Sequence, residues 1–182
     1  MVYSGDKMSK EIIHVGPLSA VASTVEASGV GYLVTLMNDQ MMVERPPSIE
    51  PARHLRLVMN DISEPKPGLV PPNDDHVQEL IDFVVDWDRK LPMLIHCWAG
   101  ISRSTAAAFI SLCALNPEID EKLIAQTLRA ASPTATPNRR LVLLADGLLK
   151  RGGRMSRAVE EIGRGQTTME GTPFQLPARL AA

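Results

Sequence analysis

The stretch that decides the fold is LIHCWAGISRST, residues 94–105. Its start continues an apolar run typical of a buried strand, and the small and apolar residues 102–115 predict a central helix packed on every side. Between them lie Cys97 and a loop in which Gly100 lets the backbone bend tightly and turn its N–H groups inward. A helix N-terminus that follows a strand attracts anions. The stretch therefore predicts a binding loop for a tetrahedral dianion.

Strand-like and helix-like segments alternate on both sides of this stretch. We expect an α/β fold in which a central, mostly parallel sheet is flanked by helices, with the phosphate-binding loop between a buried strand and the central helix. No internal repeat is visible. The predicted strands are 11–15, 30–37, 54–59 and 91–96, and the predicted helices are 18–28, 75–90, 102–115, one beginning at Pro117 after Asn116, and 138–150.

Residues 1–150 are expected to form one catalytic domain, and residues 151–182 a C-terminal appendage, docked on the surface or partly disordered. The appendage has glycine breaks, few large apolar residues and one helical stretch near 155–162. A proline-rich loop at 61–75 is long and stiff, and such loops are often functional.

Composition restricts the class of protein. The 182 residues carry 19 Lys and Arg against 21 Asp and Glu, so no basic excess favours nucleic acid. No apolar stretch is long enough to span a bilayer, residues 1–10 lack the apolar core of a signal peptide, and two cysteines make no disulfide framework. We therefore expect a cytoplasmic protein with no nucleic-acid or membrane partner. The sequence leaves the oligomeric state open.

The side chains around the loop suit attack on phosphorus. Helix N-termini favour the thiolate, so Cys97 is a candidate nucleophile, whereas Cys113 lies in an apolar stretch and reads as a core residue. Arg103 supplies a planar fork for two phosphate oxygens, and the Ser104 hydroxyl can donate to the sulfur. His96 could be a metal ligand beside Cys97, but no second Cys or His cluster completes a site. We expect no metal and no cofactor.

The string His96-Cys97-x-x-Gly100-x-x-Arg103-Ser104 resembles the HCxxGxxR[ST] signature of the protein tyrosine phosphatase superfamily. Its mid-chain position and the small domain look most like the dual-specificity branch, including its bacterial members, over residues 12–150. The resemblance implies that His96 orients the loop and helps to keep the thiolate ionised, and that Asn138 fixes the loop backbone. It also implies that substrate binds to the loop, which is Trp98, Ala99, Gly100, Ile101, Ser102 and Arg103.

A leaving oxygen needs a proton, and Asp61 is the expected general acid. It begins the proline-rich loop after a strand, in the place where the resemblance puts the acid. Asp74 and Asp75 are competitors, but Asp75 with Gln78 reads better as a capping box for the next helix. Asn138 reads equally well as a plain helix N-cap.

The expected function is a cysteine-dependent phosphatase that hydrolyses phosphomonoesters through a cysteinyl-phosphate. The loop residues between Cys97 and Arg103 are uncharged, which favours phosphotyrosine in proteins as the substrate. An inositol phosphate or another small phosphoester is the alternative. A rhodanese-like sulfur carrier would need no upstream acid, and a phosphate-binding pseudoenzyme would have lost the cysteine, the arginine or the acid.

Overall fold

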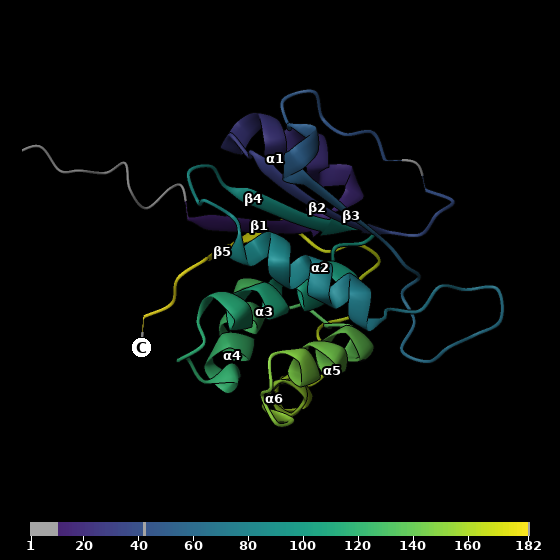
Figure 1. The fold of residues 1–182 in the computed structure, drawn as a ribbon, viewed down its shortest axis with the longest axis vertical. Coiled ribbons are helices and arrows are strands. Elements are labelled where there is room, and N and C mark those ends of the chain that lie inside the picture. Colours follow the sequence, from purple (N-terminus) through teal and green to yellow (C-terminus); the bar gives the residue numbers. More distant parts are fainter. Residues whose placement is uncertain (1–10, 42, 182) are drawn as a thin grey trace, which may run out of the picture.

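A five-stranded sheet forms the middle of the molecule (Figure 1). The structure is a computed structural model and describes residues 11–41 and 43–181. The strands lie in the order β3-β2-β4-β1-β5, of which the first four are parallel and β5 is antiparallel to β1. The predicted α/β fold with a mostly parallel sheet is confirmed. The strands are β1 (Ile12–Pro17), β2 (Tyr32–Met37), β3 (His54–Val58), β4 (Met93–Cys97) and β5 (Phe174–Pro177).

Helices cover the two faces of the sheet unequally (Figure 1). One face carries α1 (Val21–Ser28), whose Val21 and Val25 pack on Leu33 and Leu94 of the sheet. The other α-helices lie on the opposite face. They are α2 (Asp74–Val85), α3 (Arg103–Leu115), α4 (Glu121–Ala131), α5 (Arg139–Leu148) and α6 (Arg154–Ile162), and short 3-10 turns cover Leu18–Ala20 and Pro51–Arg53.

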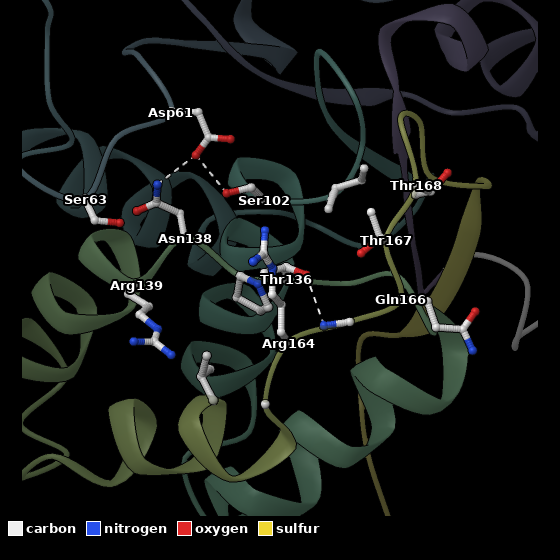
Figure 2. A pocket seen from close by; sticks show the side chains of 15 residues that line it. Asp61, Ser63, Ser102, Thr136, Asn138, Arg139, Arg164, Gln166, Thr167 and Thr168 are labelled. Atoms are coloured by element: carbon white, nitrogen blue, oxygen red, sulfur yellow. Dashed lines mark hydrogen bonds between the residues drawn. The ribbon is translucent and has the colours of Figure 1, made fainter.

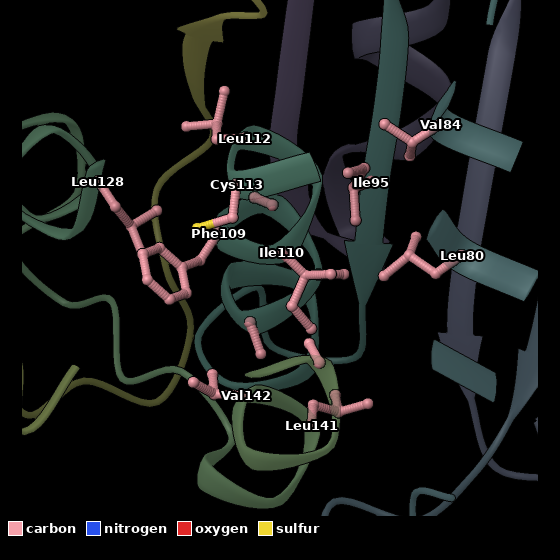
Figure 3. Packing of buried hydrophobic residues seen from close by; sticks show 14 of the residues in the cluster. Leu80, Val84, Ile95, Phe109, Ile110, Leu112, Cys113, Leu128, Leu141 and Val142 are labelled. Carbon is pink, nitrogen blue, oxygen red and sulfur yellow. The ribbon is translucent and has the colours of Figure 1, made fainter. Parts of the chain in front are cut away.

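The predicted central helix is α3, in which every residue from 103 to 113 is buried. Small side chains let its neighbours approach closely, and larger ones fill the space on two sides. Ile110 packs toward Ile95 of β4, and Phe109 packs toward Leu128 of α4 (Figure 3). Because packing on all sides fixes this helix, its N-terminus has one position relative to the end of β4.

The described part of the expected appendage, residues 151–181, is built into this fold. α6 packs against α4 and α5, and β5 pairs with β1 at the sheet edge. Met155, Val159 and Leu176 join the main apolar core, each at most 6% exposed. β5 could not be recognised from the sequence pattern because it has only four residues and one buried side chain.

Two helix starts differ from those expected. Asn73 caps α2: its side chain accepts the His76 N–H at 3.0 Å, and His76 Nδ1 accepts the Asn73 N–H at 3.3 Å. This pair forms the capping box in place of Asp75 and Gln78. The helix expected from Pro117 begins at Glu121, where Asp120 provides the cap. Several polar residues in each stretch can cap, so the local sequence does not select one.

Candidate active site

The loop Trp98–Ser102 joins β4 to α3 and turns most of its carbonyl oxygens outward. Four of its five carbonyls accept a backbone N–H from elsewhere in the chain, whereas none of the N–H groups of residues 99–102 donates to an acceptor among the described residues. With the free N–H groups that begin α3, the loop can act as an anion-binding nest. The bonds run from Leu18 N to Trp98 O (3.1 Å), Gly171 N to Ala99 O (2.8 Å), Thr136 N to Ile101 O (2.9 Å) and Asn138 N to Ser102 O (3.2 Å).

Gly100 is required by this loop for two reasons. Its φ is +71°, in the left-handed region that favours glycine. A Cβ at this position would also lie 2.6 Å from Pro17 N and 2.7 Å from Gly16 C, at the end of β1. Any other residue would therefore push the loop away from the sheet.

Cys97 lies at the floor of the loop, at the end of β4, and is 1% exposed. Its Sγ lies 3.2 Å from Ser104 Oγ in the first turn of α3. At this distance the hydroxyl can donate a hydrogen bond to a thiolate, as the sequence predicts. It can also stabilise the sulfur when the sulfur later leaves phosphorus.

Arg103 begins α3 and folds back toward the loop. One Nη donates to the carbonyl of Met59 at 3.0 Å, which fixes the plane of the guanidinium. The buried Nε has no hydrogen-bond acceptor among the described residues and lies 4.0 Å from Asp61 Oδ2. The fork therefore has one anchored edge and retains donors for an anion.

Asp61 lies beside Ser102 of the loop and beside Asn138 (Figure 2). Its Oδ1 accepts hydrogen bonds from Ser102 Oγ at 2.7 Å and from Asn138 Nδ2 at 2.8 Å. The Asn138 side chain also caps α5, and its backbone N–H donates to the Ser102 carbonyl. Asn138 therefore contacts the helix, the loop and the Asp61 carboxylate. Both sequence-based interpretations of Asn138 are compatible with this placement.

The competing carboxylates lie elsewhere. Asp74 and Asp75 form the exposed first turn of α2. Among the described residues, neither makes a hydrogen bond or an ion pair with the loop. Of the three candidates for the general acid, only Asp61 contacts the loop among the described residues, through Ser102, and it lies 4.0 Å from Arg103 Nε.

His96 is fully buried behind the loop and pairs in register with Thr35 of β2. Its Nε2 lies 2.8 Å from Thr35 Oγ1, and that hydroxyl lies 2.9 Å from His54 Nε2. The pKa of His96 is lowered to about 4, mainly by burial and also by the charge of Arg103, while the Cys97 carbonyl near Nδ1 opposes the shift. His96 is therefore neutral at pH 7 and acts on the loop through hydrogen bonds.

An apolar slot of about 370 Å³ leads to Arg103. Its apolar lining residues are Met37, Met41 and the half-exposed Trp98, and its polar lining residues are Asn38, Asp61 and Arg103. The motif placed Trp98 at the loop, but the methionines come from the end of β2 and the segment after it, with no local signal.

A second cavity, of about 500 Å³, is also lined by Asp61 (Figure 2). The loop supplies Ile101 and Ser102 to its wall, and residues 163–168 supply the facing wall. No pattern in the sequence connects residues 163–168 with the site. Its glycines, Gly163 and Gly165, were visible only as helix breaks.

The structure describes residues 11–41 and 43–181, which hold neither a metal-binding cluster nor a membrane span. Within these ranges no three His, Cys, Asp or Glu side chains cluster in a way that could hold a metal ion. No helix there has both the length and the apolar character to cross a bilayer.

No protein-family model and no curated protein matches the sequence. Solved structures do match its fold. The PTP-2 phosphatase of Cydia pomonella is 22% identical, with a TM-score of 0.55 over 74% of this chain and 84% of its own. The human tyrosine phosphatase-like serine/threonine/tyrosine-interacting protein is 17% identical, with a TM-score of 0.59 over 77% and 92%. PTPMT1, solved in complex with PI(5)P, is 12% identical, with a TM-score of 0.59 over 76% and 90%.

These matches define the class of fold. The chain has the fold of the protein tyrosine phosphatase superfamily, in the form found in dual-specificity phosphatases such as DUSP15 and human DUSP28. The resemblance noted in the sequence is confirmed at this level.

Proposed function

We propose that this protein is a cysteine-dependent phosphatase that hydrolyses phosphomonoesters. The observation that carries the proposal is the loop between β4 and α3, which directly follows Cys97 and in which no N–H group of residues 99–102 donates to an acceptor among the described residues. Such a nest holds a tetrahedral dianion above the sulfur, and Asp61 lies where a leaving group would emerge. The solved phosphatases with this fold support the same reaction class.

The reaction runs in two steps. The Cys97 thiolate forms a bond to phosphorus while the phosphorus–oxygen bond to the leaving group breaks, and Asp61 gives its proton to that oxygen. Asp61, now a carboxylate, takes a proton from water as the water oxygen attacks the cysteinyl-phosphate. The thiolate leaves with a hydrogen bond from Ser104, and phosphate is released. The loop N–H groups and Arg103 neutralise the charge in both steps, so the chain itself supplies the positive field.

Phosphotyrosine in proteins is the proposed substrate. The slot beside Trp98 has methionines on its sides and Arg103 at its inner end, which suits an aromatic ring attached to a phosphate. An inositol phosphate is the second candidate, because PTPMT1 shares the fold and was solved with PI(5)P. A flat ring buries well between methionine side chains, whereas a ring covered with hydroxyls does not.

Turnover of 4-nitrophenyl phosphate in the presence of EDTA tests the proposal. We expect the wild-type protein to turn over and the Cys97→Ser variant to lose more than about 99% of the rate, because a serine alkoxide is far harder to form than a thiolate. The variant retains the loop N–H groups and should still bind vanadate. Full activity of Cys97→Ser, or complete loss of wild-type activity with EDTA, would refute the mechanism.

Assays of the same wild-type protein with thiosulfate and with vanadate distinguish the phosphatase from two other classes of protein. A rhodanese-like sulfur carrier would form a persulfide from thiosulfate and release no phosphate from the aryl ester. A phosphate-binding pseudoenzyme would bind vanadate without turnover.

A further inference from the structure

The peptide units of the loop Trp98–Ser102 are oriented by hydrogen bonds from outside the loop. A trans peptide is planar, so its N–H points away from its C=O. When another segment holds a carbonyl on the outer side of the loop, the N–H of the following residue must point to the inner side. The carbonyls held in this way belong to Trp98, Ala99, Ile101 and Ser102. The inward direction of the N–H groups therefore depends on donors elsewhere in the chain.

Three of the four donors lie next to elements of the main body of the fold. Leu18 directly follows β1, and Thr136 and Asn138 directly precede α5. The fourth donor is Gly171, which lies between α6 and β5 in the C-terminal part of the chain. Its N–H donates to the Ala99 carbonyl at 2.8 Å, the shortest of the four bonds.

Gly171 acts on the peptide unit of the loop that can rotate most easily. That unit joins Ala99 to Gly100, whose φ is +71°. Glycine adopts positive and negative φ about equally well, so a rotation that turns the Gly100 N–H outward is opposed by no Cβ. The residues of the loop set the turn, but they leave two directions open to this one peptide. The hydrogen bond from Gly171 selects the direction in which the Gly100 N–H points inward.

The segment that carries Gly171 is fixed on both sides. β5 begins three residues after it, and Phe174 pairs with Val15 of β1. On the other side, Gln166 N donates to the Pro133 carbonyl at 2.9 Å. Gly171 is therefore held against the loop by segments that belong to the folded core.

The contact between Gly171 and the loop leaves no room for a side chain. A Cβ at this position would lie 2.9 Å from the Gly100 carbonyl oxygen and 3.4 Å from the Ala99 carbonyl oxygen. A Cβ therefore has to displace either the segment or the loop. The adjacent Glu170 accepts a hydrogen bond from Ser19 Oγ at 2.9 Å, so the segment resists displacement.

We infer that Gly171 is a positioning residue for the candidate active site. Its backbone N–H orients the Ala99–Gly100 peptide so that the Gly100 N–H can bind the dianion. The C-terminal segment is then a working part of the site, although it touches no reacting atom. The inference rests on the proposed phosphatase function and adds to it a residue outside the signature motif.

Gly171→Ala tests this role, and Gly147→Ala is its matched control. Gly147 lies in α5, and a Cβ there meets no described atom within 4 Å outside its own helix. For Gly171→Ala we expect the Kd for inorganic vanadate to rise about tenfold or more, because a hydrogen bond to a charged group contributes that much to binding. The kcat for 4-nitrophenyl phosphate should fall about 10²-fold, as when one donor to the developing charge is lost. Gly147→Ala should keep both values.

A second variant removes the donor without adding an atom to the contact. An ester bond in place of the amide between Glu170 and Gly171 exchanges the N–H for oxygen. It should raise the Kd for vanadate as Gly171→Ala does, even if Gly171→Ala does not fold. The matched control is an ester between Pro67 and Gly68, because the Gly68 N–H donates to no acceptor in the described part of the chain.

An NMR signal separates positioning from a purely structural role. In wild type the Gly100 amide proton should shift downfield when vanadate is added, because it binds the anion. In the Gly171 ester this shift should be lost, whereas the free energy of unfolding should stay close to that of the Gly68 ester.

Failure of this inference differs from failure of the proposed function. A wild-type Kd for vanadate and a wild-type Gly100 shift in the Gly171 ester overturn the positioning role and leave the phosphatase proposal standing. Absence of turnover in wild type means that the proposed function has failed. Vanadate binding needs no turnover, so the comparison of the two esters still decides the role of Gly171.

Discussion

The loop Trp98–Ser102 and the C-terminal segment 163–168 line two walls of the same cavity. The conformation of the loop follows from its own residues, whereas the position of the segment follows from contacts with distant parts of the chain. The conformation of the loop is set by residues close to it in sequence. β4 ends at Cys97, Gly100 has a φ of +71°, and α3 begins at Arg103. The segment 163–171 reaches the site because β5 pairs with β1 and because Gly171 N donates to the Ala99 carbonyl. A candidate catalytic centre can thus be local in sequence while the surface around it is assembled from distant parts of the chain.

The largest expected effect tests whether the proposed hydrolysis depends on Asp61, which contacts the loop. Asp61→Asn removes the proton donor, so hydrolysis of a phosphotyrosine peptide should fall about 10²–10⁴-fold. 4-Nitrophenyl phosphate should lose much less, since 4-nitrophenolate leaves largely unaided. Steady-state kinetics on both substrates measures the difference.

Asp75→Asn is the control for this prediction, because Asp75 lies in the exposed first turn of α2. It should leave both rates unchanged. If Asp75→Asn abolishes peptide hydrolysis and Asp61→Asn does not, the general acid is wrongly placed.

The next effect tests whether the C-terminal segment belongs to the core. Leu176 of β5 is 1% exposed, so Leu176→Ala should lower the free energy of unfolding by about 2–5 kcal/mol. Leu143→Ala, at a side chain that is 62% exposed, should change it by less than about 0.5 kcal/mol. Denaturant unfolding measures both. Equal effects would mean that β5 is only loosely attached.

Acid should lower the free energy of unfolding through the buried histidines near the loop, because residues 151–182 contain no histidine. The pKa values of His96 and His54 are lowered to about 4, from 6.5, mainly by burial. The unfolded chain therefore binds more protons between these values, and the free energy of unfolding should fall as the pH drops from about 6.5 to 4.

For the fully buried His96 this loss amounts to a few kcal/mol, at roughly 1.4 kcal/mol per pH unit. Unfolding curves across this range should show a flatter pH dependence for His96→Gln. Because His76 is less buried and its pKa is lowered less, His76→Gln should keep most of the slope. Identical slopes for wild type and His96→Gln would contradict this assignment.

The smallest expected effect compares the two cysteines. Thiolates are oxidised faster than thiols, and burial strongly raises the pKa of the Cys113 thiol, so peroxide should inactivate the protein through Cys97. Ten helical residues separate Arg103, beside Cys97, from Cys113, about 15 Å along α3, which is too far for a disulfide. Cys113→Ala should leave the rate of peroxide inactivation unchanged. Detection of a Cys97–Cys113 disulfide in folded protein would contradict it.

Much of the candidate active site could be predicted from the sequence, because the residues that indicate it lie close together in the chain. An apolar strand, Cys97, Gly100, Arg103 and a helix of small residues follow one another within about twenty positions. Asp61 was predicted because it begins the proline-rich loop after a strand, in the place where the resemblance puts the acid, and in the structure it accepts hydrogen bonds from Ser102 and Asn138. The helix caps at Asn73 and Asp120 were missed, because each lies among other residues that cap equally well.

By itself, the sequence determined the α/β fold, the loop, and the candidate nucleophile, arginine and acid, since strand and helix periodicity and the residues of a tight turn act over a few positions. Only the tertiary structure decided that Thr35 joins His54 to His96, that Met37 and Met41 flank Trp98, and that Arg164 faces the loop. These contacts depend on strand order and on packing between segments far apart in the chain. No local pattern encodes which distant backbone or side chain will meet another, because that is set by burial of the shared core.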